Sequence, residues 1–253
     1  MGTIVTIDVY TAAEVTGAGL GVLRGQLARA RAVLHHADEV FSTWQPCSPV
    51  SRLRRGEISL VQAPPEVADV LERCAAAREL SGGWFDPWAM PGGVDPTGYV
   101  KGWAAQKALA AFSGGTICGA IVNAAGDIAS SGGLRHGRPF RIGIADPASS
   151  RRLAEIVELT GAIATSGTYE RGSHLIDPHS GRAAARAASA SVTGPDLGLA
   201  DALATALAVA GQPGLALIEP LAGYEALVIG FDGSRRWTAG FPFAPRTAGA
   251  AQG

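Results

Sequence analysis

The sequence has 253 residues, of which 47% are hydrophobic and 17% charged, and its formal net charge at pH 7 is -1. A chain of this length can bury a substantial core, as one large domain or two small ones. The near-neutral charge gives no reason to expect a nucleic-acid partner, because neutralising phosphates requires a clustered basic surface. The nearest approach to such a surface is Arg52, Arg54 and Arg55, which we expect to form a solvated turn.

Cysteine usage and the apolar pattern exclude further classes. Cys47, Cys74 and Cys118 are too few and too scattered for a disulfide framework or a zinc site. No stretch is apolar enough to span a membrane, because charged residues and prolines interrupt residues 197–230. The sequence as written shows no secretory signal, so we expect a cytoplasmic protein, or an exported one if its natural start lies further upstream.

The first half of the chain predicts mainly helices and loops. Residues 3–10 alternate between apolar and polar side chains, as a half-buried strand does. A long helix is predicted from about Ala18 to Phe41 by an apolar stripe through Leu20, Leu23, Leu27 and Leu34. The further elements predicted here are a loop over residues 42–54, a helix from Pro65 to Gly82, a loop over residues 84–97 and a helix from Lys101 to about Phe112.

The second half predicts mostly strands, with a sharp turn at residues 124–127. The predicted strands cover residues 117–123, 140–145, 153–160, 189–193 and 225–231, and one helix covers residues 199–210. Helices and strands mix without a strict βαβ rhythm, which favours an α+β or mixed-sheet fold. The last residues, 246–253, are small and polar and predict a disordered tail.

Residues 163–181, IATSGTYERGSHLIDPHSG, gather more titratable side chains than a turn requires. His174 stands three residues before Asp177, and a carboxylate can orient or tune a histidine that acts as a general base. The alternative is a hairpin in which His174 only bonds the backbone. A Ser166, His174 and Asp177 hydrolase is a further alternative, although Ser166 lacks the G-x-S-x-G elbow.

Two further clusters suit a metal and a phosphate. Asp201 and Thr205 are four residues apart in a predicted helix, so their oxygens share one face and could bind Mg²⁺. The alternative role for Asp201 is a first-turn acid that stabilises the helix dipole. In VDPTGYVKG, the Gly98 carbonyl could reach a metal and Lys101 a phosphate, unless the segment is a plain turn with a solvated lysine.

Taken in order, these motifs resemble those of the ApbE family, the FAD:protein FMN transferases. The matching segments are MGT, STW with SPVSRL, WFDP, VDPTGYVKGWA, VNAAGD, ATSGTYERGSHLIDPHSG, and SVT with ADALATAL. The resemblance runs from Met1 to about Gly211. Ala125 stands where the family usually has a second glycine, and Thr168 stands where SGDYE is common, so both positions depart from the pattern.

The resemblance implies a mixed α/β fold of two lobes, formed by one domain over residues 1–245, with FAD in the groove between the lobes. It implies Mg²⁺ bound by the Gly98 carbonyl, Asp201 and Thr205. His174 would be the catalytic residue, supported by Asp177. The residues implied to bind FAD are Met1, Trp44, Phe85, Asp86, Asp95, Lys101 and Leu175.

The implied reaction is attack by a threonine hydroxyl of an acceptor protein on the FMN phosphorus of FAD, with release of AMP. An acceptor motif of the form D-x-x-[ST]-[GA]-A-T is absent from this chain, so we do not expect it to flavinylate itself. The alternatives are a metal-dependent FAD pyrophosphatase, which gives FMN and AMP, and a non-enzymatic FAD-binding protein. The sequence makes no prediction of oligomeric state.

Overall fold

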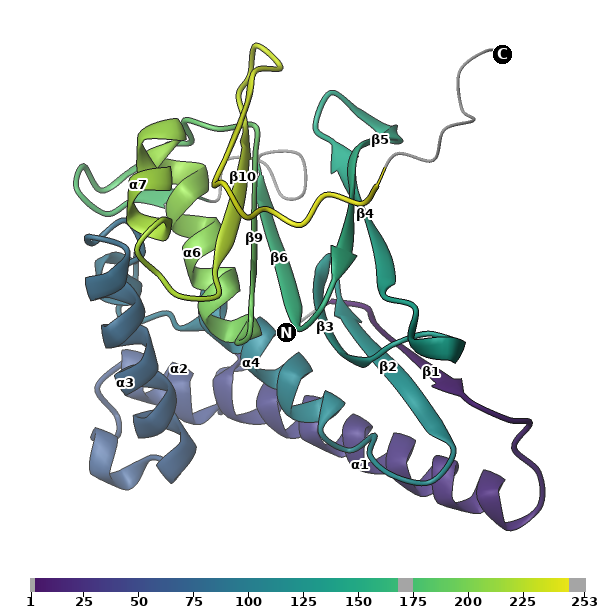
Figure 1. Ribbon diagram of the computed structural model, residues 1–253. Helices are drawn as coiled ribbons and strands as arrows, with labels where there is room; N and C mark the ends of the chain where they lie inside the picture. The colour runs from purple at the N-terminus through teal and green to yellow at the C-terminus, as the bar shows by residue number, and fades with distance from the viewer. Residues whose placement is uncertain (1–2, 168–174, 246–253) are drawn as a thin grey trace.

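A single antiparallel sheet forms the centre of the computed structural model, which describes residues 3–167 and 175–245 (Figure 1). Its strand order is β1-β2-β3-β6-β9-β10-β11, and every neighbouring pair runs antiparallel. The strands are β1 (Val5–Thr11), β2 (Ile117–Ala124), β3 (Asp127–Gly132), β6 (Ala162–Gly167), β9 (Ser189–Gly194), β10 (Glu225–Ile229) and β11 (Arg235–Trp237). With helices packed against such a sheet, the α+β prediction is confirmed.

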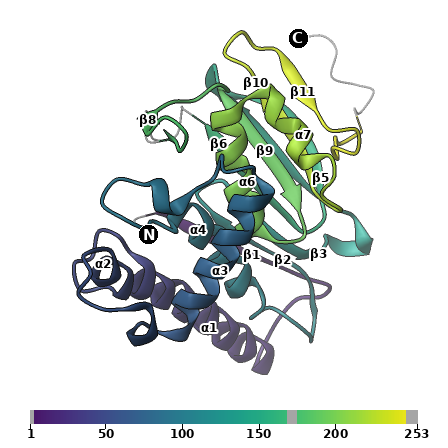
Figure 2. The same cartoon turned by 90° about the vertical axis from the view of Figure 1, so that its left-hand side faces the viewer.

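Helices cover one face of the sheet (Figure 2). α4 packs on β2 and β3, α6 packs on β6 and β9, and the two helices pack on each other. α1 lies along α4 on the side away from the sheet, and α3 contacts both α4 and α6. The helices are α1 (Ala18–Phe41), α2 (Pro49–Arg54), α3 (Pro65–Leu80), α4 (Thr97–Leu109), α6 (Leu197–Ala210) and α7 (Leu215–Ile218).

The opposite face of the sheet is covered by a long hairpin of β4 (Phe140–Asp146) and β5 (Ser149–Leu159). Its apolar side chains, Phe140, Ile144, Val157 and Leu159, form one buried cluster with Ile121, Ile128, Ile163, Leu227, Ile229 and Phe241. A small hairpin of β7 (Ile176–Asp177) and β8 (Arg182–Ala183) stands apart from the sheet. Of the helices in residues 3–167 and 175–245, none is both long and apolar enough to cross a membrane.

Contact between α4 and α6 is unusually close because Gly102 has no side chain. A Cβ at this position would overlap the backbone carbonyl of Leu197 at the start of α6. α6 is buried on nearly all sides, which explains why its sequence, LGLADALATALAVA, is almost entirely small or apolar. The close contact holds the second turn of α4 against the first turn of α6, one turn before Asp201.

Several local predictions were wrong or incomplete: β6, β7, β8 and β11 were not predicted, and α4 begins at Thr97 rather than at Lys101. Residues 42–54 contain helix α2, because Ser48 accepts a hydrogen bond from the Ser51 N–H as an N-cap and Pro49 follows at the first helical position. The α1 bounds are confirmed, but its buried face uses Gln26, Ala30, Ala37, Val40 and Phe41, whereas Leu20 and Leu27 are exposed. Strand β3 was not predicted.

The sharp turn at residues 124–127 is confirmed and explains β3. β2 ends at Ala124 and β3 begins at Asp127, so only Ala125 and Gly126 connect the two strands. Both have positive φ, at 51° and 97°. This combination is typical of the two-residue turn that matches the twist of antiparallel strands.

Candidate functional site

One pocket lies where the start of α4, the middle of α6 and the end of β6 meet the loop after α1 and the loop between α3 and α4. It is lined by nine of the residues selected from the sequence: Trp44, Phe85, Asp86, Asp95, Gly98, Lys101, Leu175, Asp201 and Thr205. Asp177 does not line the pocket, but its neighbours Ile176 and Pro178 do. Met1 and His174 lie outside the described residues.

An oxygen cluster forms the floor of this pocket. Asp201 lies in the second turn of α6, 3% exposed, and within the described chain no donor reaches its Oδ2 atom. One turn further on, the Thr205 hydroxyl lies 3.2 Å from the Ser166 hydroxyl. Gly98 is close to this hydroxyl, because a Cβ there would stand 3.8 Å from Thr205 Oγ1.

The position of Asp201 decides between its two predicted roles. α6 begins at Leu197 and is capped by Asp196, whose carboxylate accepts a hydrogen bond from the Leu199 N–H. Asp201 is therefore not a first-turn acid. The buried carboxylate of Asp201 and the half-buried hydroxyl of Thr205 suit a hard cation such as Mg²⁺, which keeps several water or substrate ligands. The described residues contain no group of three or more His, Cys, Asp or Glu side chains arranged for a metal.

Lys101 is held by a residue that our sequence analysis did not assign to the site. Its Nζ lies 2.5 Å from Oδ2 of Asp127, which is fully buried and whose Oδ1 also accepts the Thr165 N–H at 3.2 Å. Lys101 is therefore not the solvated lysine of a plain turn. Asp127 follows the Ala125-Gly126 turn, and an acid directly after a tight glycine turn was the available signal for it.

Burial makes both carboxylates, Asp127 and Asp201, costly to ionise. Burial raises the pKa of Asp127 above its usual value, against the opposing charge of Lys101. Burial and then the nearby charge of Asp127 raise the pKa of Asp201 well above its usual value. One lysine thus faces two acids in a dry environment, and a proton or a bound cation would balance the remaining charge.

Aromatic side chains form the pocket wall. Phe85 is buried, and its backbone N–H donates to Ser81 Oγ, whereas Trp44 on the loop after α1 is 89% exposed. In the loop at residues 84–97, Phe85 packs in the core and also lines the pocket, and Trp88 remains 45% exposed. The exposed indole of Trp44 and the buried ring of Phe85 both line the pocket and offer two surfaces for a planar ligand.

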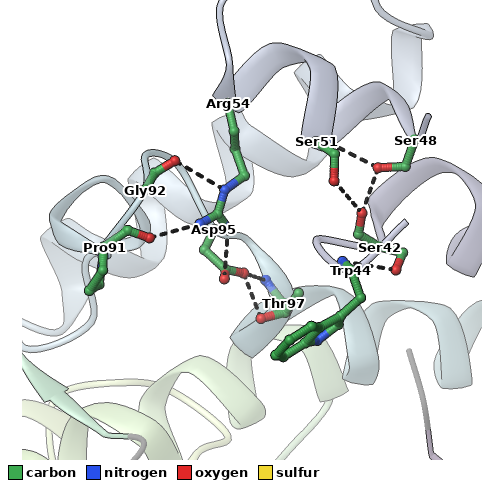
Figure 3. Close-up of polar contacts among 9 residues, drawn as sticks. All are labelled: Ser42, Trp44, Ser48, Ser51, Arg54, Pro91, Gly92, Asp95 and Thr97. Carbon is green, nitrogen blue, oxygen red and sulfur yellow. Dashed lines mark hydrogen bonds and ion pairs between the residues drawn. The ribbon is translucent and has the colours of Figure 1, made fainter. Parts of the chain in front are cut away.

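Two acids of the pocket wall are engaged by arginines. Asp86 Oδ2 accepts from Arg78 Nε at 2.6 Å, and Asp95 Oδ2 accepts from Arg54 Nη1 at 2.9 Å (Figure 3). The prediction of a solvated arginine turn is wrong for Arg54, whose side chain is only 15% exposed. Arg52 and Arg55 are about half exposed, as expected, and pair with Glu57.

Asp177 closes the small turn beside the pocket. Its Oδ1 accepts the His179 N–H at 2.9 Å, and Arg186 Nη2 lies 4.0 Å from its Oδ2. Burial alone would raise the pKa of Asp177, but hydrogen bonds from His179 and Ser180 outweigh it and hold the pKa below its usual value. The His179 ring in turn meets Trp84 edge to face, with 4.5 Å between ring centroids.

Comparison with known proteins gives a consistent family and fold. The sequence profile of the ApbE family matches residues 1–93 and 89–228. Two relatives named FAD:protein FMN transferase are each 36% identical to this chain, one from Rhodobacter capsulatus over 152 residues and one from Vibrio cholerae serotype O1 over 138 residues. The matches cover 56% and 50% of this chain, and 29% and 41% of the relatives, so they span less than half of those proteins.

The fold is similar to that of a solved structure, the flavin transferase ApbE from Vibrio cholerae. The two share 22% sequence identity with a TM-score of 0.77, over 94% of each chain. The family profile covers most of this sequence, including every segment that contributes to the pocket. The chain therefore belongs to the ApbE family.

Proposed function

We propose that this protein transfers FMN from FAD to a threonine hydroxyl of an acceptor protein in an Mg²⁺-dependent reaction that releases AMP. The observation that carries the proposal is the pocket itself, which joins an aromatic wall, Lys101 and the oxygen cluster of Gly98, Asp201 and Thr205. The names of the two relatives support the transfer of FMN from FAD to a protein. We propose residues 1–245 as the transferase unit.

The proposed transfer exchanges the phosphoanhydride bond of FAD for a phosphoester bond to the acceptor. The threonine oxygen attacks the FMN phosphorus of FAD and forms a new P–O bond. The P–O bond to the bridging oxygen of the pyrophosphate breaks, and AMP leaves with that oxygen. The hydroxyl proton passes to a base, a role that we assign to His174. Such a transfer depends mainly on in-line positioning and on balancing the phosphate charge.

The described residues would divide these tasks. Trp44 and Phe85 would hold the flavin ring, and Lys101, fixed by Asp127, would face the phosphates. Gly98, Asp201 and Thr205 would hold Mg²⁺. A bound Mg²⁺ would neutralise part of the pyrophosphate charge. Asp177 would support the segment that contains His174.

Incubation with FAD and an acceptor domain that carries the threonine motif tests the proposal. With Mg²⁺, we expect AMP release together with in-gel flavin fluorescence of the acceptor, and with EDTA we expect neither. AMP with free FMN and a dark acceptor would instead indicate a pyrophosphatase. Absence of AMP would indicate a protein that only binds FAD.

The variant His174→Ala tests the proposed base. We expect it to retain FAD and to lose labelling of the acceptor by roughly 100-fold or more, the usual contribution of a general base. His35→Ala provides the control, because His35 lies exposed on α1, outside the pocket. Labelling by His174→Ala at the wild-type rate would remove His174 from the mechanism.

A further inference from the structure

Arg54 is the one arginine of α2 that points into the protein. Its guanidinium donates to the Pro91 carbonyl at 2.8 Å and the Gly92 carbonyl at 3.3 Å, besides its 2.9 Å contact with Asp95 (Figure 3). One side chain thus holds three acceptors of the loop between α3 and α4. A planar guanidinium can satisfy several acceptors at fixed angles, which a lysine ammonium cannot do.

The loop is shaped to fit this side chain. Gly92 and Gly93 have φ values of +81° and +101°, which side chains rarely adopt. A Cβ at Gly92 would stand 3.0 Å from Arg54 Nη2, and one at Gly93 would stand 3.4 Å from the Arg54 carbonyl oxygen. The two glycines therefore allow the loop to close directly over the arginine.

Asp95 connects this contact to α4. While its Oδ2 binds Arg54, its Oδ1 accepts hydrogen bonds from the Thr97 N–H at 3.0 Å and from the Thr97 hydroxyl at 2.6 Å. Thr97 is the first residue of α4, Gly98 follows it in the first turn, and Lys101 lies one turn further on. The position of Arg54 thus affects the start of the helix that presents Gly98 and Lys101 to the pocket.

The N-terminal end of α2 holds the loop after α1, which contains Ser42 and Trp44. The hydroxyls of Ser48 and Ser51 both donate to the Ser42 carbonyl, at 2.5 and 3.0 Å. Ser42 Oγ in turn accepts the N–H of Trp44 at 3.3 Å. Helix α2 and its N-cap Ser48 therefore bind both loops that line the pocket, through Ser48 and Ser51 on one loop and Arg54 on the other.

We infer that Arg54 is a positioning residue of the FAD pocket, which fixes residues 91–97 and, through Asp95, the first turn of α4. Arg54 is not among the residues that line the pocket, so it acts through Asp95 and the loop. The inference rests on the proposed function in taking FAD as the ligand. The restraint on the loop itself does not depend on the ligand.

Three variants at neighbouring positions test the inference. Arg54→Met removes all three contacts, Arg54→Lys retains the charge, and Arg52→Met changes a half-exposed arginine of the same helix. We expect the dissociation constant for FAD to rise about tenfold or more in Arg54→Met and by less in Arg54→Lys, and to stay unchanged in Arg52→Met. The KM for FAD should rise while the KM for the acceptor does not.

Hydrogen exchange provides a readout without ligand or turnover. Amide exchange should become faster within residues 91–97 in Arg54→Met, at unchanged circular dichroism, and should remain at the wild-type rate in Arg52→Met. If wild-type protein fails to transfer FMN, the proposed function fails, and exchange and FAD affinity still test Arg54. Wild-type exchange and affinity in Arg54→Met would overturn the inference, as would an equal loss in Arg52→Met.

A double variant separates action through Asp95 from a general loss of stability. In Arg54→Met with Asp95→Asn, we expect the loss of FAD affinity to be close to that of the more severe single variant. Residues that act in one chain of contacts show such non-additivity. Fully additive losses would show that Arg54 does not act through Asp95. If Arg54→Met does not fold, Arg54→Lys with Asp95→Asn supplies the same comparison.

Discussion

Ala125 combines a side chain with a backbone conformation that suits glycine. Its φ of 51° lies in the left-handed region, where the Cβ of an alanine crowds the following carbonyl at a cost of about 1–2 kcal/mol. The turn is retained because it joins β2 to β3 in register and places Asp127 beneath Lys101. The rest of the fold thus offsets the backbone strain at Ala125, which lies beside the site.

Replacing this side chain should stabilise the protein. For Ala125→Gly, we expect the free energy of unfolding to rise by about 0.5–1 kcal/mol, because relief of the strain exceeds the added flexibility of glycine in the unfolded chain. Urea unfolding would measure the change. Ala124→Gly is the control, since Ala124 is a fully buried strand residue, and there we expect a loss. A loss in both variants would contradict the strain at Ala125.

At the scale of single residues, the sequence revealed the parts of the site whose partners are close along the chain. Asp201 and Thr205 are one helical turn apart, so their common face follows from local geometry. Asp127 and Arg54 were not identified, because their roles depend on Lys101 and Asp95, which lie on other elements. Arg54 contacts a residue 41 positions away, and composition alone made it appear solvated.

Among the elements, the α4 and α6 pair depends on one glycine. For Gly102→Ala, we expect a loss of about 1–3 kcal/mol in the free energy of unfolding, because the added Cβ would overlap the Leu197 carbonyl and push the helices apart. The same shift would move Gly98 and Lys101 away from Asp201 and Thr205. FAD affinity should therefore fall at temperatures where the variant remains folded.

A glycine of α1 gives the matched control for this variant. A Cβ at Gly21 would meet no atom within 4 Å, although Gly21 is also inside a helix. Gly21→Ala should stabilise the protein by about 0.5–1 kcal/mol, the usual gain from replacing glycine in a helix interior. Thermal unfolding of both variants makes the comparison, and a gain in Gly102→Ala would show that the two helices can separate without cost.

Most elements followed from periodicity and from start and stop residues. Proline and glycine marked the limits of α3, and the bounds of α1 were predicted to the residue. The buried face of α1 was not, because it uses Gln26 and small alanines that allow α4 to approach closely. Helix α2 was missed because six residues are too few to show a period, and only the Ser48-Pro49 step signalled it.

Across the whole molecule, buried groups that lose a proton at high pH make the free energy of unfolding depend on pH in the alkaline range. Burial raises the pKa of Cys74 from 9.0 to about 12, and burial raises that of Tyr99 and Tyr224 from 10.0 to about 12. Below about pH 9, the folded and unfolded chains both retain these protons. As the pH rises from about 9 toward 12, the unfolded chain releases them first, so stability falls.

Urea unfolding between pH 8 and pH 10.5 checks this dependence. We expect the free energy of unfolding to fall as the pH rises, with a slope of up to about 1.4 kcal/mol per pH unit for each group. Cys74→Ala should reduce the slope between pH 9 and 10.5, whereas Cys47→Ala, at an exposed position, should not. Equal slopes in all three proteins would remove Cys74 from the dependence.

The pairing of β1 also determines the order in which the protein can assemble during synthesis. β1 lies at the edge of the sheet, and its neighbour there, β2, covers residues 117–124. On the ribosome, β1 emerges well before this partner, and the helices α1 to α4 are made in between. Closing so long a loop costs entropy that no local contact of β1 offsets. The nascent strand β1 therefore remains unpaired, and accessible to chaperones, until residues 117–124 have left the ribosome.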